Sequence, residues 1–251
     1  MSENRVRTAA GVGALLLLAL LVSCGDGDTE SSTTGPGRTA GEVAALLVGP
    51  EALGDGWSTL TDPGGEYAFD DGVVTDENRD MLPRFEQCAA ADETSQQDID
   101  TPQWDAYRQL NLATGTASGE PTPGTRPEHH LVFVQEYLLA DDPSAVTASY
   151  AELERGMEAC ANQETTSEDG ETITSEPLDA PAVGDAATGL RYTVTEPGGG
   201  GAVWDLRTVA FRSGDLLVGL TVAEIATPTV DRVLDDAAFA EIVRATADAT
   251  S

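Results

Sequence analysis

The chain has 251 residues, a formal net charge of −31 and only 5% aromatic residues. A surface this acidic repels nucleic acid and anionic lipid headgroups, which argues against both as partners. All basic residues are arginine, so lysine chemistry of the Schiff-base or Walker type is excluded. We interpret the charge as a solvated surface; the alternative is a surface that binds a cation or a basic peptide.

The first 23 residues have the three zones of an export signal. Arg5 and Arg7 give a positive start, and Gly11–Val22 is apolar but shorter than the roughly 20 residues of a membrane-spanning helix. Leu21-Val22-Ser23-Cys24 then resembles the lipobox of bacterial lipoproteins, whose Cys sulfur receives a diacylglycerol before cleavage. The sequence therefore predicts a signal peptide at 1–23 and a lipid with acyl chains such as palmitate on Cys24. This lipid would hold the protein on the outer face of the cell membrane; an ordinary signal peptide is the alternative.

A linker and one domain are expected after the signal. Residues 24–39 contain the lipidated Cys24 and a stretch with no apolar residue to bury, which is typical of a flexible tether. Residues 40–249 are long enough for one domain with its own core. Cys88 and Cys160 remain for a disulfide, because exported proteins fold in an oxidising compartment.

In the first half, a helix is expected over Ala40–Val48, and the turn-rich stretch after it delivers Trp57. A strand is expected at Ala106–Leu112 and another at His130–Leu139. Asp142 can cap a helix that has Pro143 in its first turn. The helix shows one apolar stripe at helical spacing: Val146, Tyr150, Leu153, Met157 and Cys160.

A charged linker is expected at Ala161–Gly170. Four strands are expected after it: Glu171–Ser175, Leu190–Thr195, Ala202–Phe211 and Leu216–Ala223. Ser213-Gly214 predicts a tight turn between the last two. On the first arm Trp204 and Leu206 share one face, which favours core packing of Trp204, while Asp205 and Arg207 point the other way. A closing helix is expected from Thr227-Pro228. The fold class is α+β, a mainly antiparallel sheet covered on one face by helices.

This order of parts resembles a known family. The features are a Leu-Gly-x-Gly-Trp turn at 53–57, a VFVQEY strand at 132–137, a helix that ends in Cys160, a Gly-Asp turn at 184–185 and an Arg-Ser-Gly-Asp tip at 212–215. Together they resemble the PknH-like extracellular sensor domain of actinobacterial receptor kinases and surface lipoproteins. The resemblance implies a sensor-like α+β domain with a groove on its sheet and no catalysis. That family commonly has two disulfides, whereas this chain has cysteines for one.

Catalytic motifs are scarce. The chain lacks the G-x-S-x-G, H-E-x-x-H, P-loop and G-x-G-x-x-G patterns, and we expect no cofactor and no catalytic residue. His129 and His130 are adjacent, so in a strand they point to opposite faces and cannot readily share a metal. Asp76, Asn78 and Asp80 match only the opening of an EF-hand loop, and we expect no metal site.

Trp57, Trp104 and Tyr137 are the candidate ligand-binding residues, with Trp104 expected to be partly exposed because Asp105 follows it. The leading hypothesis is a membrane-anchored surface lipoprotein whose domain binds a cell-envelope ligand or a partner protein without catalysis. One alternative is an envelope hydrolase that uses an Asp/Glu pair, with His129 or His130. Another is a structural surface protein without a ligand.

Overall fold

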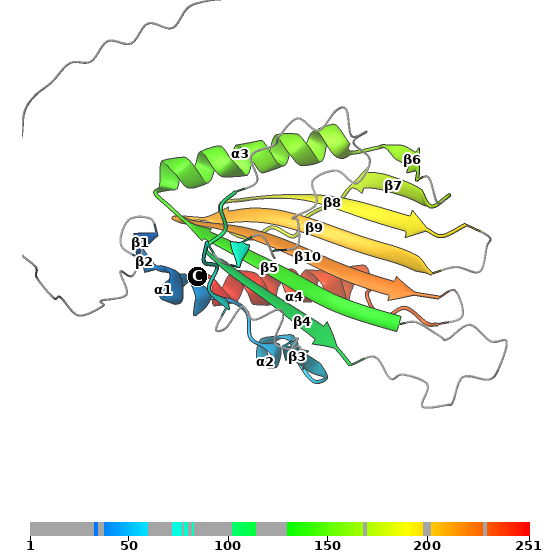
Figure 1. Cartoon of the computed structure of the whole chain (residues 1–251), viewed down its shortest axis with the longest axis horizontal. Coiled ribbons are helices and arrows are strands. Elements are labelled where there is room, and N and C mark those ends of the chain that lie inside the picture. The colour runs from blue at the N-terminus through cyan, green and yellow to red at the C-terminus, as the bar shows by residue number, and fades with distance from the viewer. Residues whose placement is uncertain are drawn as a thin grey trace, which may run out of the picture. The chain divides into compact units, whose positions relative to one another are not determined.

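A computed structural model describes residues 33–34, 38–59, 72–76, 78–79, 82, 102–113, 130–167, 170–197, 202–227 and 230–251. They belong to one compact unit that runs from Ser31 to Ser251. Within these residues, an eight-stranded sheet has the order β3-β4-β5-β10-β9-β8-β7-β6 (Figure 1). Its strands are β3 (Trp57–Thr59), β4 (Ala106–Leu112), β5 (His130–Ala140), β6 (Glu164–Thr166), β7 (Thr172–Pro177), β8 (Ala186–Thr195), β9 (Val203–Ser213) and β10 (Leu216–Ala226).

All neighbouring strands of this sheet are antiparallel, which confirms the α+β class with a mainly antiparallel sheet. The helices are α1 (Ala40–Ala44), α2 (Pro50–Leu53), α3 (Pro143–Cys160) and α4 (Asp236–Ala249). A separate short pair, β1 (Thr33–Thr34) with β2 (Arg38–Thr39), precedes α1. Arg38 Nε lies 3.1 Å from the carboxylate of Asp215, so β2 is tied to the turn between β9 and β10.

The β9–β10 hairpin is confirmed and lies in the middle of the sheet. Its register runs without a bulge from the Ser213–Leu216 pair to the Val203–Ala226 pair. Gly214 has a φ of +61° in the turn, a conformation that glycine adopts without a steric penalty. Nearly every residue of β10 is buried, so this strand needs cover on both of its faces.

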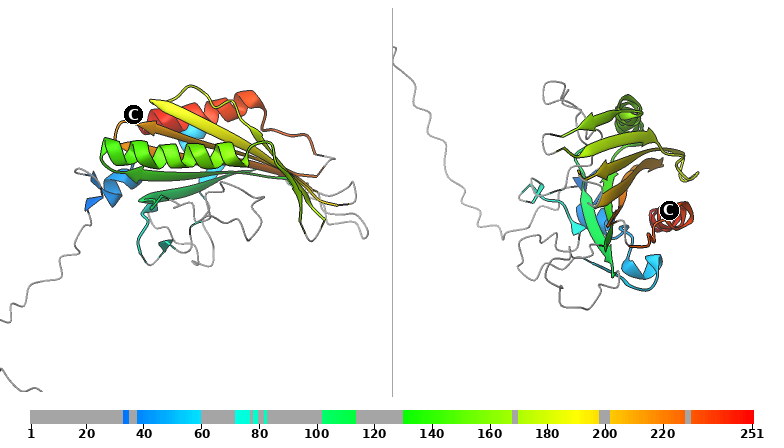
Figure 2. Two further views of the ribbon diagram at one scale, coloured as in Figure 1. Left: turned by 90° about the horizontal axis from the view of Figure 1, so that it is seen from above. Right: turned by 90° about the vertical axis from the view of Figure 1, so that its right-hand side faces the viewer.

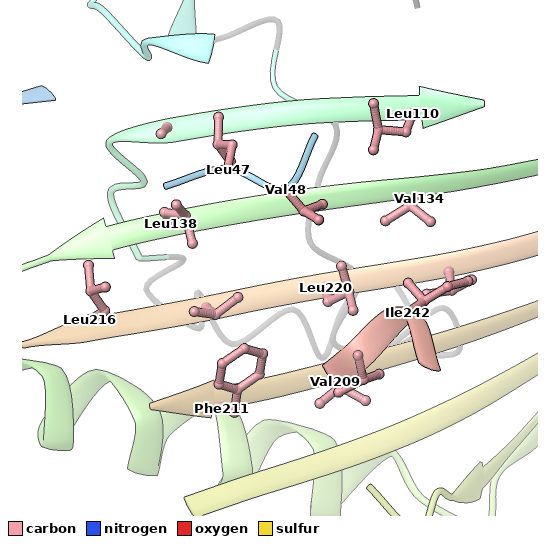
Figure 3. Close-up of a cluster of buried hydrophobic side chains, with 14 of the residues drawn as sticks. Leu47, Val48, Leu110, Val134, Leu138, Val209, Phe211, Leu216, Leu220 and Ile242 are labelled. Carbon is pink, nitrogen blue, oxygen red and sulfur yellow. The ribbon is translucent and has the colours of Figure 1, made fainter. Parts of the chain in front are cut away.

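Helices therefore lie on both faces of the sheet, not on one as expected (Figure 2). The face that we call the α4 face is covered by α1, α2 and α4. Figure 3 shows part of its core, in which side chains such as Val134, Leu220 and Phe211 stand on neighbouring strands. The opposite face, the α3 face, packs α3 against residues such as Tyr137 and Leu217. The apolar stripe of α3 is buried as predicted.

The beginning of α3 follows the sequence prediction. The Asp142 carboxylate accepts hydrogen bonds from the backbone N–H groups of Ser144 (2.9 Å) and Ala145 (3.1 Å), and Pro143 occupies the first turn. The α1 helix begins as predicted but ends at Ala44 rather than Val48. The half-buried Arg108 of β4 and the buried Glu136 of β5 bind the backbone at its end and replace the helical hydrogen bonds there.

Two segments differ from the expected elements. The expected closing helix starts at Asp236, because Asp235 caps it by accepting the Ala238 N–H at 2.8 Å, and the preceding residues are held by Glu224 of β10. The expected linker after α3 contains the edge strand β6, which pairs with β7. The backbone N–H of Ser175 donates to the carbonyl of Gln163 at 2.9 Å, which places the linker beside β7.

The prediction that Trp204 lies in the core is wrong. Trp204 shares the α3 face with Leu206, but it is 39% exposed. The end of α3 is fixed beside β7, where the hydroxyl of Ser175 donates to the carbonyl of Cys160. Ser175, Tyr192 and Leu206 form one cross-strand row, and Trp204 lies in the next row, beyond the helix. That row contains Ile173, Val194, Trp204, Ile225 and Leu131.

Among the described helices, none combines the length and the apolar character needed to span a membrane. The predicted signal peptide and Cys24 lie outside the described residues. The lipid anchor therefore stays a prediction from the sequence.

Candidate functional site

An apolar pocket of about 200 Å³ lies on the α4 face, between α2, β3 and α4. Leu112 and Val132 line it from β4 and β5, and Ala238 and Ile242 line it from α4. Glu241 of α4 is the single charged residue of the lining. A cavity of 150 Å³ in another protein holds benzene, and sites for drug-sized ligands start near 300 Å³. This pocket therefore suits one ring or a short aliphatic chain.

Of the three residues predicted to bind a ligand, Trp57 lies at this pocket. Trp57 is half-buried at the start of β3 and lines the pocket with Leu53 of α2. Trp104 and Tyr137 are on the α3 face, with their rings 5.5 Å apart between centroids. The structure therefore does not bring the three side chains to one site.

The expected exposure of Trp104 is wrong, because its side chain is only 2% exposed. Its ring packs on Tyr137, and Tyr137 also packs on Tyr107 at 5.0 Å. The neighbouring Asp105 is buried too, and its carboxylate accepts the Ala140 N–H at 2.9 Å. Aromatic contacts and a backbone hydrogen bond thus bury a dipeptide whose charge suggested a surface position.

A buried carboxylate fixes one wall of the pocket. Val233 and Leu234 line the pocket, and their backbone N–H groups donate to Glu224 at 2.8 and 3.2 Å. The imidazole Nε2 of His130 is 2.8 Å from the same carboxylate. Glu224 is 0% exposed, so these three neighbours, rather than water, are the hydrogen-bond partners of its carboxyl group.

Asp205 stands directly opposite Glu224 on β9 and is surrounded by three arginines. Arg191 binds both of its carboxylate oxygens at 2.8 Å, Arg232 lies at 3.1 Å and Arg207 at 3.4 Å. Burial on its own raises the pKa of Asp205. The hydrogen bonds and charge of Arg191, followed by those of Arg207, outweigh burial and hold the pKa below its usual value.

This ion network also holds the beginning of α4. Arg207 donates to the carboxylate of Asp236 at 2.9 Å and to the carbonyl of Leu234 at 3.3 Å. Asp205 and Glu224 are close acids, as a hydrolase would need, but they are 1% and 0% exposed and engaged with arginine or backbone donors. We interpret the pair as the anchor of α4.

No group of three or more His, Cys, Asp or Glu residues is placed to hold a metal ion within the described ranges. In the segment that opens like an EF-hand, the side chain of Asn78 binds the backbone of Thr75 and Val73 and so shapes its own loop. Asp80 and His129 lie outside the described residues, so their expected roles stay predictions.

Cys160 is buried at the end of α3, against the sheet. Cys88, its predicted disulfide partner, lies outside the described residues. The pairing stays a prediction that a mass measurement can test.

The polar network was not predicted from the sequence, although a signal for it exists. Glu224 is in phase with Leu216, Leu220 and Val222 on β10, so the strand period of two places a charge on a buried face. Such a residue needs partners. The three arginines that approach Asp205 come from separate parts of the chain, and their convergence requires the fold.

No protein-family model matches the chain, and no curated protein matches it. Among solved structures, the extracellular domain of PknH from Mycobacterium tuberculosis is similar, with a TM-score of 0.40 and 12% identity, over 84% of this chain and 96% of that one. The Mll3558 protein from Rhizobium loti has a TM-score of 0.26 and 13% identity, over 49% of this chain and 99% of that one. The resemblance to the PknH-like domain predicted from the sequence is therefore supported only as a weak similarity of fold. We base no functional argument on it.

Proposed function

We propose that the chain is a lipid-anchored surface protein whose α+β domain binds a small cell-envelope ligand and catalyses no reaction. The pocket beside Trp57 is the observation that carries this proposal. Its lining residues have apolar side chains except for Glu241, and a mainly apolar lining with a few polar groups is usual for a small-molecule site. The anchor rests on the lipobox-like residues 21–24.

The polar interior supports a binding role over a catalytic one. Two buried acids of the α4 face, Asp205 and Glu224, are engaged by arginine side chains and by backbone or imidazole N–H groups. A general acid or base must reach a substrate proton within hydrogen-bond distance. Because the carboxylates of Asp205 and Glu224 already accept hydrogen bonds within the protein, we assign them to holding the wall of the pocket in place.

The proposal can be tested by native mass spectrometry of residues 25–251, exported through an oxidising compartment of a related bacterium. An Ala238→Leu variant fills the pocket, because Ala238 lines it from α4. Ala237→Leu is the matched control, because Ala237 is exposed on the same helix. Ala238→Leu should abolish a co-purifying mass that Ala237→Leu retains.

A co-purifying mass that survives Ala238→Leu would move the ligand away from this pocket. If all three proteins are free of ligand, a screen of small apolar compounds by thermal shift decides. Failure of every compound to stabilise the unmodified protein more than Ala238→Leu would refute the proposal.

A further inference from the structure

We infer that the pocket beside Trp57 selects an apolar group that carries a cationic head, such as a primary ammonium. The inference rests on the proposed function, because it specifies the ligand of the same pocket. Its apolar part follows from the lining, in which Trp57, Leu112, Val132 and Ile242 surround a volume of about 200 Å³.

The charge of the head follows from Glu241. This residue is exposed on α4 at the pocket and is the one charged residue of the lining. A cation whose apolar end fills the pocket can place its charge beside this carboxylate. The net charge of −31 adds a long-range field of the same sign, which attracts cations and repels anions.

The donors that an anionic head would need are already engaged. The backbone N–H groups of Val233 and Leu234, both lining residues, donate to Glu224. The neighbouring Arg232 directs its guanidinium to Asp205 at 3.1 Å. A carboxylate or phosphate in the pocket would thus meet Glu241 without a matching donor from these groups.

The experiment is an NMR titration of residues 25–251 with three probes of equal chain length: hexylammonium, hexan-1-ol and hexanoate. Amide shifts of Ala238 and Ile242 give each Kd. Because ion pairs of exposed groups are weak, hexylammonium should bind about two- to fivefold more tightly than hexan-1-ol, and hexanoate more weakly by a similar factor. Glu241→Gln should reduce the differences between the three Kd values, because only the long-range field of the remaining charges is left. Glu152→Gln, an exposed change on α3, should leave the order intact.

The outcomes separate the two proposals. Equal Kd values for the three probes, or differences between them that are as large in Glu241→Gln, would overturn the cation preference while leaving an apolar binding pocket. Absence of shifts at Ala238 and Ile242 with every probe, hexan-1-ol included, would overturn the binding function itself.

Discussion

Glu136 of β5 is a buried acid whose protonation should control the stability of the domain. It is 1% exposed on the α4 face, one carboxylate oxygen accepts the Val48 N–H at 2.8 Å, and the other has no hydrogen-bond partner among the described residues. Burial raises the pKa of Glu136 from 4.5 to about 8, although the Val48 N–H and the charge of Arg108 oppose the shift.

The sign and size of the effect follow from this shift. Between pH 4.5 and about 8 the folded protein keeps a proton on Glu136 that the unfolded chain releases. Unfolding therefore becomes easier as pH rises through this window, and each pH unit costs about 1.4 kcal/mol. The total loss attributable to Glu136 is roughly 5 kcal/mol by pH 8.

Glu136→Gln removes the titration and keeps an oxygen that can accept the Val48 N–H. Urea unfolding at a series of pH values from 5 to about 9 measures the free energy of unfolding of both proteins. Relative to the unmodified protein, the variant should gain stability steadily as pH rises. Glu152→Gln, on the exposed side of α3, should follow the unmodified protein. Parallel curves for Glu136→Gln and the unmodified protein would refute the reasoning.

Three other predictions follow from the fold and the sequence. Asp205→Ala leaves the buried Arg207 with the exposed Asp236 as its one acidic partner among the described residues and should cost about 3–5 kcal/mol in urea unfolding; a loss below 1 kcal/mol would contradict the network. Cys24→Ser should move the protein from the detergent phase to the aqueous phase; retention in the detergent phase would argue against the lipid. Gly184→Ala and Gly214→Ala both strain a left-handed backbone, but only Gly184 is crowded, by a carbonyl 2.3 Å from an added Cβ. The Tm of Gly184→Ala should therefore fall further than the Tm of Gly214→Ala. Equal decreases in Tm would contradict the crowding at Gly184.

Local signals in the sequence predicted much of the fold. The stripe from Val146 to Cys160 fixed the buried side of α3, and Ser213-Gly214 marked the turn of the central hairpin. These features depend on residues close together in the chain, where helix period and turn chemistry act. The alternation on β9 was also right, since Asp205 and Arg207 face away from Trp204.

Errors arose where distant segments decide burial. The prediction for Trp204 named the correct face, but whether that face is covered depends on where α3 ends. Trp104 was assigned to the surface from its neighbours, and Tyr137 from another strand buries it. The late start of α4 depends on Glu224, which holds the chain before it. Strand period alone cannot reveal such contacts.

The candidate site was predicted in part. Trp57 was chosen as an aromatic after a turn, and it lines the pocket. Glu241 was not chosen, because an exposed acid in a chain of net charge −31 does not stand out. The carboxylate of Glu241 lies at an apolar pocket only because α4 packs against α2 and β3.

The way α4 is attached has a consequence for amide hydrogen exchange. This helix forms one wall of the pocket, while β4 and β5 of the sheet form another. A helix held to a sheet by side chains can open locally without breaking any strand pairing. We therefore expect the amides of α4 to exchange faster than those of β9 and β10. A ligand bound in the pocket should slow amide exchange in α4 selectively. The exchange rate of this one helix would then report, in the intact protein, how much of the pocket is occupied.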